Sequence, residues 1–104
     1  MDKKTHKAIK TYLYLLNNQY DGIEQAILFG SYAKNKERKE SDIDIAIVFS
    51  QMTDDEKFDI QVQLMLLASE VDTRIEPHPL SITDYASNSP FVREIKKNGV
   101  VLKM

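Results

Sequence analysis

Two aspartates separated by one residue, Asp42 and Asp44, are the side chains best suited to chemistry. They lie where an apolar run rich in β-branched residues begins, Ile43 to Phe49, and such a run predicts a strand. Because residues i and i+2 of a strand point to the same side, both carboxylates are expected on one face. Like charges this close repel unless a cation lies between them, and such oxygen ligands suit Mg²⁺ or Mn²⁺. The alternative is a solvated strand end that carries two capping aspartates.

A Gly-Ser pair, Gly30-Ser31, ends another apolar segment, and ten residues separate Ser31 from Asp42. Glycine lets the backbone turn sharply or approach a ligand closely, and the serine hydroxyl can bind a phosphate oxygen. We expect a short helix to begin over Ser31 to Lys34, whose N-terminal N–H groups would attract a phosphate. The alternative is a tight turn with a serine cap, and the pair is not part of a Walker A loop. The two motifs together predict a site for metal ions and a triphosphate.

Hydrophobic periodicity predicts helices and strands that alternate along the chain. The expected helices cover residues 4–19, 53–69 and 90–98, and the expected strands cover 23–29, 43–49, 71–76 and 100–102. The helix over 53–69 begins at a capping box of Thr53 and Glu56. Its expected core-facing stripe consists of Phe58, Val62, Met65 and Leu66. The strand over 71–76 is expected to stop at Pro77, near a sheet edge. These elements predict an α/β (α+β) fold, a small mixed β-sheet flanked by helices.

The composition of the chain restricts the class of protein to which it can belong. Its 104 residues fit one domain, 1–104, and 42% hydrophobic with 29% charged residues is ordinary for a globular protein. The absence of cysteine excludes disulfides and thiolate metal sites, and it is compatible with a cytoplasmic location. No apolar run is long enough for a membrane span, and no signal peptide is expected. A net charge of −2 argues against direct binding of nucleic acid.

The chain has two histidines, His6 and His78. They are too few and too far apart in the sequence to predict a metal site. His78 lies between two prolines and is therefore expected in a loop, where contact with a substrate is the functional alternative.

Two stretches of the sequence carry a family resemblance. The segments Leu28 to Lys34 (LFGSYAK) and Glu40 to Ile45 (ESDIDI) together resemble the signature of the DNA polymerase β-like nucleotidyltransferase superfamily. They look most like its small prokaryotic branch, the minimal nucleotidyltransferases, and the resemblance covers most of the chain from Ile23 onward. The ending from Phe91 to Leu102 is also similar to that branch. Members commonly show Arg-Gly where this chain has Lys34-Asn35. Lysine keeps the positive charge but cannot make the paired hydrogen bonds of an arginine guanidinium.

The resemblance implies a third carboxylate on a later strand, for which Asp72 and Glu76 are the candidates. The text DTRIEP resembles the family's Asp-x-Arg-hydrophobic-x-Pro strand, whose first residue is the catalytic aspartate. Asp72 is therefore the expected third ligand, and Glu76 is the runner-up. The alternative is a solvated ladder of charges on one strand face, with Arg74 between the two acids.

The mechanism that the resemblance implies uses two Mg²⁺ ions, with Mn²⁺ as the alternative metal. One ion lowers the pKa of an attacking hydroxyl, and the other binds the triphosphate and stabilises the leaving pyrophosphate. The catalytic and metal-binding residues would be Asp42, Asp44 and Asp72. The nucleotide-binding residues would be Gly30, Ser31 and Lys34, the last of which would neutralise phosphate charge.

The implied activity is transfer of a nucleoside monophosphate, AMP from ATP, to an acceptor hydroxyl. The chain is too short to carry the substrate domain of larger relatives, so we expect a partner to supply the acceptor. In the minimal branch the partner is commonly a small helical HEPN-type protein, and some such pairs are toxin–antitoxin systems in which AMP is added to a tyrosine. Two alternatives remain: a non-catalytic antitoxin or assembly subunit that binds its partner, and a nucleotide-binding sensor.

Overall fold

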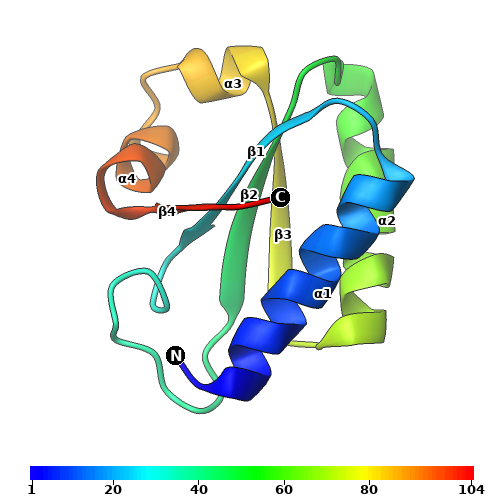
Figure 1. The fold of residues 1–104 in the computed structure, drawn as a ribbon. Coiled ribbons are helices and arrows are strands. Elements are labelled where there is room, and N and C mark those ends of the chain that lie inside the picture. The colour runs from blue at the N-terminus through cyan, green and yellow to red at the C-terminus, as the bar shows by residue number, and fades with distance from the viewer.

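The computed structural model describes all 104 residues and contains four helices and four strands (Figure 1). Their order is α1 (Lys3–Gln19), β1 (Ile23–Phe29), β2 (Ile43–Phe49), α2 (Asp54–Val71), β3 (Ile75–Ser81), α3 (Ile82–Ala86), α4 (Pro90–Asn98) and β4 (Val100–Leu102). The predicted α/β class is confirmed, as is the capping box at the start of α2. No helix combines the length and the apolarity that crossing a bilayer requires.

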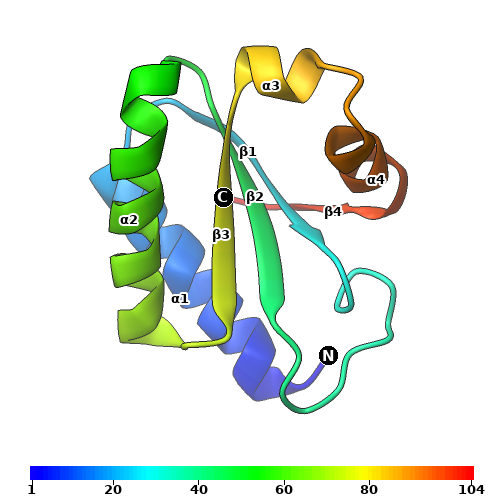
Figure 2. The ribbon, with the colours of Figure 1, turned by 180° about the vertical axis from the view of Figure 1, so that it is seen from behind.

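The four strands form one mixed sheet in the order β3-β2-β1-β4. Strand β1 is antiparallel to both β2 and β4, whereas β3 runs parallel to β2. Helices α1 and α2 cover one face of this sheet, and α3 and α4 lie on the other side, as the two opposite views show (Figures 1 and 2). The parallel pair is connected through α2, the crossover that parallel strands require.

The central strand β2 is apolar along nearly its whole length because both of its faces are covered. Ile43, Ile45 and Ile47 belong to the larger core cluster, which they share with side chains from α1 and α2. Ala46 and Val48 belong to a second cluster that includes side chains from α4. Asp44 is separated from Ala46 and Val48 by an even number of positions, so its side chain lies on the same face of the sheet as theirs. It therefore points away from the main core, toward the end of the sheet face that carries α4.

Helix α2 does not bury the stripe of residues that periodicity predicted. Phe58, Val62, Met65 and Leu66 are 76%, 41%, 50% and 63% exposed. The buried residues are instead Leu64 and Ala68, with Ile60, Leu67 and Val71 packed partly against the core. The helix therefore carries two apolar stripes, and contact with α1 and β3 selects one of them. The hydroxyl of Tyr12 in α1 donates to the Leu64 carbonyl oxygen at 2.9 Å, and this hydrogen bond stabilises the orientation in which the Leu64 face of α2 is buried.

Strand β3 is an edge strand, as predicted, but it runs over Ile75–Ser81 rather than 71–76. Pro77 therefore lies inside the strand instead of ending it. The N–H of Ile75 points away from β2, since it donates to the Asp72 carbonyl oxygen at 3.1 Å. The N–H direction alternates along a strand, so positions 77 and 79 point the same way as Ile75, away from β2. The N–H groups that Pro77 and Pro79 lack would therefore not have bonded to β2.

Candidate active site

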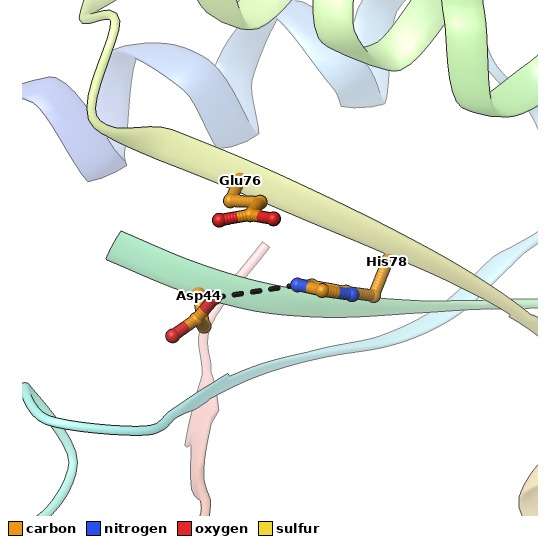
Figure 3. A group of neighbouring side chains, drawn as sticks. All are labelled: Asp44, Glu76 and His78. Atoms are coloured by element: carbon orange, nitrogen blue, oxygen red, sulfur yellow. Dashed lines mark hydrogen bonds and ion pairs between the residues drawn. The ribbon is translucent and has the colours of Figure 1, made fainter. Parts of the chain in front are cut away.

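The parallel register of β2 and β3 brings three potential metal ligands together. Asp44 is paired with Glu76, and Ala46 is paired with His78. A ligand atom from each of Asp44, Glu76 and His78 lies within 4.8 Å of the others, and Figure 3 shows the three side chains gathered over the neighbouring strands. His78 Nε2 lies 3.3 Å from Asp44 Oδ1. Two carboxylates and an imidazole are suitable ligands for a divalent ion.

Asp42 lies directly before β2 and adds a further negative charge beside Glu76. The pKa of Glu76 is raised by desolvation, by a hydrogen bond with Asp42, and by the negative charges of Asp42 and Asp44, while His78 opposes the shift. Glu76 is exposed to solvent as a whole residue, and the carboxylates of Asp42 and Asp44 beside it disfavour its charged form. Asp42, Asp44 and Glu76 therefore form a group of mutually repelling charges that a cation would relieve.

Gly30 lies against the carboxylate of Asp44. Its φ of +73° belongs to the left-handed region, which favours glycine. A Cβ atom added at this position would lie 2.5 Å from Asp44 Oδ2. The backbone at Gly30 therefore lies closer to the candidate metal ligand than a residue with a Cβ atom could, and the two sequence motifs come together in space.

The segment after Gly30 forms turns and not the short helix that was predicted. The Lys34 N–H donates to the carbonyl oxygens of Gly30 and Ser31 at 3.3 and 3.2 Å, and the Lys36 N–H donates to that of Ser31 at 2.9 Å. Asn35 then takes a positive φ of 56°, which ends any helical continuation. The predicted helix is therefore wrong, and this segment supplies no helix N-terminus at which a phosphate could bind.

Lys34, the predicted phosphate ligand, makes an ion pair with another element. Its Nζ lies 2.7 Å from Glu94 Oε1 in α4, and the two side chains are 41% and 44% exposed. Exposed pairs of this kind contribute little to stability and exchange readily with other partners. The pair lowers the pKa of Glu94, whose other contact is with Asn98.

Asp72, the predicted third carboxylate, is placed with Arg74 and not with the acidic group. Arg74 donates through Nε to Asp72 Oδ1 at 3.1 Å and through Nη2 to Oδ2 at 2.8 Å. This guanidinium lowers the pKa of Asp72. The same guanidinium donates to the Tyr32 hydroxyl at 3.0 Å and to Thr5 Oγ1 at 3.1 Å. Asp72 thus belongs to a structural network, and Glu76 occupies the position beside Asp44.

The reason for this difference is where α2 ends. The prediction of Asp72 assumed a strand over 71–76, in which positions 72, 74 and 76 would share one face. Helix α2 continues to Val71, Asp72 is its C-cap, and β3 begins only at Ile75. Of the two acids, only Glu76 is therefore in the strand.

His78 is the site residue that the sequence reasoning missed. It lies in β3 and not in a loop, and its ring packs against Phe29 and Phe91 with centroid distances of 5.0 and 5.8 Å. The signal that would have found it is its spacing of two from Glu76, which places both side chains on one strand face. The flanking prolines concealed this spacing because prolines normally mark the end of a strand.

Comparison with known protein families finds one family model that matches most of the chain. A family model described as "Polymerase beta, Nucleotidyltransferase" matches residues 8–104. This chain belongs to that nucleotidyltransferase family. The match extends from the middle of α1 to the end of the chain and includes every residue of the acidic group, so the site described above lies wholly within the family region.

Individual relatives show the same fold or a shared segment. A proposed protein adenylyltransferase of Methanocaldococcus jannaschii, MJ0604, is 54% identical over 43 residues, which are 40% of this chain and 43% of that protein. The chain thus matches less than half the length of this curated relative. A proposed nucleotidyltransferase from Sulfolobus solfataricus is 23% identical, with a TM-score of 0.66 over 91% of this chain and 76% of that one.

Two further structures come from toxin–antitoxin complexes. One is a toxin–antitoxin with AMP-PNP, with 21% identity and a TM-score of 0.66 over 90% of this chain and 71% of that one. The other is a tri-AMPylated Shewanella oneidensis HEPN toxin with an MNT antitoxin, with 20% identity and a TM-score of 0.60 over 96% and 71%. At these identities the likeness shows a shared fold.

Proposed function

We propose that this chain is a metal-dependent nucleotidyltransferase that transfers AMP from ATP to an acceptor hydroxyl. The observation that carries the proposal is the pairing of Asp44 with Glu76, beside Asp42 and against the Gly30 backbone, in a chain of the nucleotidyltransferase family. We propose Glu76 as the third catalytic carboxylate in place of Asp72.

The donor set fits a divalent ion, since nucleotidyltransferases generally use such metals and this group offers carboxylate oxygens. We propose that Asp42, Asp44 and Glu76 hold two Mg²⁺ ions. When bound, the ions would lower the pKa of the attacking hydroxyl and stabilise the charge of the leaving pyrophosphate.

The residues of the chain have distinct roles in this proposal. The Gly30 backbone and the Ser31 hydroxyl hold the phosphates, and Lys34 can leave its exposed pair with Glu94 to neutralise them. A carboxylate of the acidic group takes the proton of the acceptor hydroxyl. The acceptor oxygen then forms a bond to the α-phosphorus, the bond from that phosphorus to the bridging oxygen breaks, and pyrophosphate leaves.

We propose that the acceptor is a tyrosine hydroxyl on a small helical HEPN-type protein. Support comes from the complexes of similar fold, one of which contains an AMPylated HEPN toxin, and from the proposed adenylyltransferase activity of the M. jannaschii relative. Because ATP and such partners are found together in the cytoplasm, we propose that the protein works there.

A second candidate function is that of an antitoxin or assembly subunit that acts by binding alone. The observation that favours it is the exposed apolar stripe of α2, which a bound protein would remove from water. The two functions differ in whether the acidic group is required.

The experiment that separates them is coexpression with a HEPN-type protein from the same genome, followed by intact mass measurement of that protein. We expect a shift of one AMP for each modified tyrosine, and we expect none with Asp44→Asn or Glu76→Gln. Asp72→Asn is the matched control and should still modify the partner. Modification by the Asp44 and Glu76 variants would refute the catalytic proposal, whereas neutralisation without modification would favour binding alone.

A further inference from the structure

We propose that His78 is a nitrogen ligand of a divalent ion that Asp44 and Glu76 also bind, and that it shifts the metal preference of this site from Mg²⁺ toward Mn²⁺. The inference rests on the proposed function, because it concerns an ion at the same site. It adds a ligand that neither the two-aspartate motif nor the third carboxylate supplies.

The distances within the cluster fit one ion. Two adjacent ligands of an octahedral ion, at bond lengths near 2.1 Å, lie about 3 Å apart, and opposite ligands lie about 4.2 Å apart. The distance from His78 Nε2 to Asp44 Oδ1 is 3.3 Å, and all three ligand atoms lie within 4.8 Å of one another. The limit of 4.8 Å exceeds the opposite-ligand distance by about 0.6 Å and the adjacent-ligand distance by about 1.8 Å, so an ion would need to draw the side chains together by no more than about 2 Å.

The packing of the imidazole favours this geometry. The ring packs against Phe29, at 5.0 Å and 62°, and Phe91, at 5.8 Å and 48°, and these two rings also contact each other at 5.4 Å. These rings limit its rotation, and Figure 3 shows Nε2 directed at the Asp44 carboxylate. In the absence of an ion, Nε2–H donates to Asp44 Oδ1. With the ion bound, the proton resides on Nδ1 and the Nε2 lone pair becomes the ligand.

The metal preference follows from ligand chemistry. Carboxylates and water suit both Mg²⁺ and Mn²⁺, whereas imidazole favours transition-metal ions. Exchange of one oxygen ligand for an imidazole nitrogen therefore lowers the affinity for Mg²⁺ relative to that for Mn²⁺. His78 is the ligand that sets this difference, since it is the only histidine in the cluster.

The test uses the full chain with Mn²⁺ alone and detects the ligand nitrogen by pulsed electron paramagnetic resonance. We expect ¹⁴N modulation from Mn²⁺ bound to the unaltered protein, and we expect the nitrogen frequencies to change after labelling with ¹⁵N-histidine. This labelling needs no substitution, so the result does not depend on the folding of a variant. The ¹⁴N signal should disappear in His78→Ala and in His78→Gln.

The other histidine provides a matched control. His6 is exposed on α1 and lines a surface hollow with Lys3, Lys7 and Lys10, where a cation is disfavoured. His6→Ala should therefore keep the nitrogen signal. In competition experiments, His78→Ala should lower the ratio of Mn²⁺ to Mg²⁺ affinity by about tenfold or more. Residues that only hydrogen-bond to a metal ligand already change metal affinity by this factor, and His78 is proposed as a ligand itself.

Failure of this inference can be distinguished from failure of the proposed function. Mn²⁺ bound in an Asp44-dependent manner without any histidine nitrogen signal would overturn the role of His78 and leave nucleotidyl transfer intact. A histidine nitrogen signal in a protein that transfers no AMP would support the ligand and refute the activity. An affinity ratio that is the same in His78→Ala and His6→Ala would also overturn the inference.

Discussion

Substitution of Gly30 by alanine tests whether the backbone must approach Asp44 so closely. The added Cβ would lie 2.5 Å from Asp44 Oδ2, whereas ordinary contact begins at 3.4 Å. The carboxylate must therefore move by about 0.9 Å, and a displacement near 1 Å at a catalytic group can lower the rate about 10²-fold. The positive φ of 73° adds a strain of about 1–2 kcal/mol for any L side chain.

The matched control is Gly22→Ala. Gly22 also has a positive φ, of 80°, but its Cβ would meet the flexible hydroxyl of Ser50, far along the sheet from the acidic group. Gly22→Ala should lose about 1–2 kcal/mol of unfolding free energy from the φ strain alone, and Gly30→Ala should lose this amount plus the cost of displacing the Asp44 carboxylate. Each kcal/mol corresponds to a fall in Tm of about 4–8 °C in a chain of this size. Only Gly30→Ala should also lose activity.

The assay combines thermal unfolding with AMP transfer at a temperature where both variants are folded. The double variant Gly30→Ala with Asp44→Ala separates the clash from the backbone strain. Truncation of Asp44 removes the carboxylate that the new Cβ would meet, whereas the φ strain at position 30 remains. The destabilisation by Gly30→Ala should then fall to that of Gly22→Ala. Equal activity of the two single variants would refute the placement of Asp44 in the reacting group.

Three further outcomes are expected. Glu76→Gln should lower the rate of AMP transfer by about 10²-fold or more, while the rate of Asp72→Asn should stay within a few-fold of the unaltered protein. Equal losses in the two variants, measured by modification of the partner, would reject Glu76 as the third carboxylate in place of Asp72. Asp72→Asn should instead destabilise the fold by about 2 kcal/mol at pH 7, from the loss of charged hydrogen bonds to Arg74. Because Arg74 holds the folded pKa of Asp72 below its unfolded value, near 4, this contribution is present above the unfolded pKa and disappears as the pH falls through the lowered pKa. A difference between the two proteins that does not shrink as the pH is lowered below about 4 in urea titrations would contradict this cause. Leu66→Glu should leave stability within about 0.5 kcal/mol yet weaken binding of a helical partner in calorimetry, and unchanged affinity would exclude the α2 stripe as a docking surface.

Local sequence patterns were sufficient for the parts of the site that depend on local geometry. The spacing of Asp42 and Asp44 placed both acids near one ligand group, and Gly30 marked a backbone approach, because strand parity and glycine conformation are properties of neighbouring residues. The same is true of the elements themselves. Strand β2 was predicted with its observed bounds, Ile43–Phe49, because both of its faces are apolar.

The misplaced features depend on contacts between distant residues. Helix α2 has apolar residues on two faces, so periodicity could not choose the face that meets α1. The assignment of the third carboxylate depended on whether Val71 to Arg74 joined the helix or the strand, and the packing of Val71 against the core favours the helix. Pro77 can belong to β3 because β3 is an edge strand and position 77 points away from β2, and no local pattern reveals which positions of a strand point that way.

The backbone of Arg74 and the side chain of Glu76 are connected through the register of β2 and β3. Arg74 folds back onto Asp72 at the end of α2, and its carbonyl oxygen accepts from the Ile43 N–H at 2.7 Å, at the start of the β2–β3 ladder. From this point the parallel pairing aligns Glu76 with Asp44. A slip of one residue would turn Glu76 to the opposite face of the sheet. The Arg74 backbone therefore contributes to the site by beginning the ladder that pairs Glu76 with Asp44, although Arg74 itself does not belong to the acidic group.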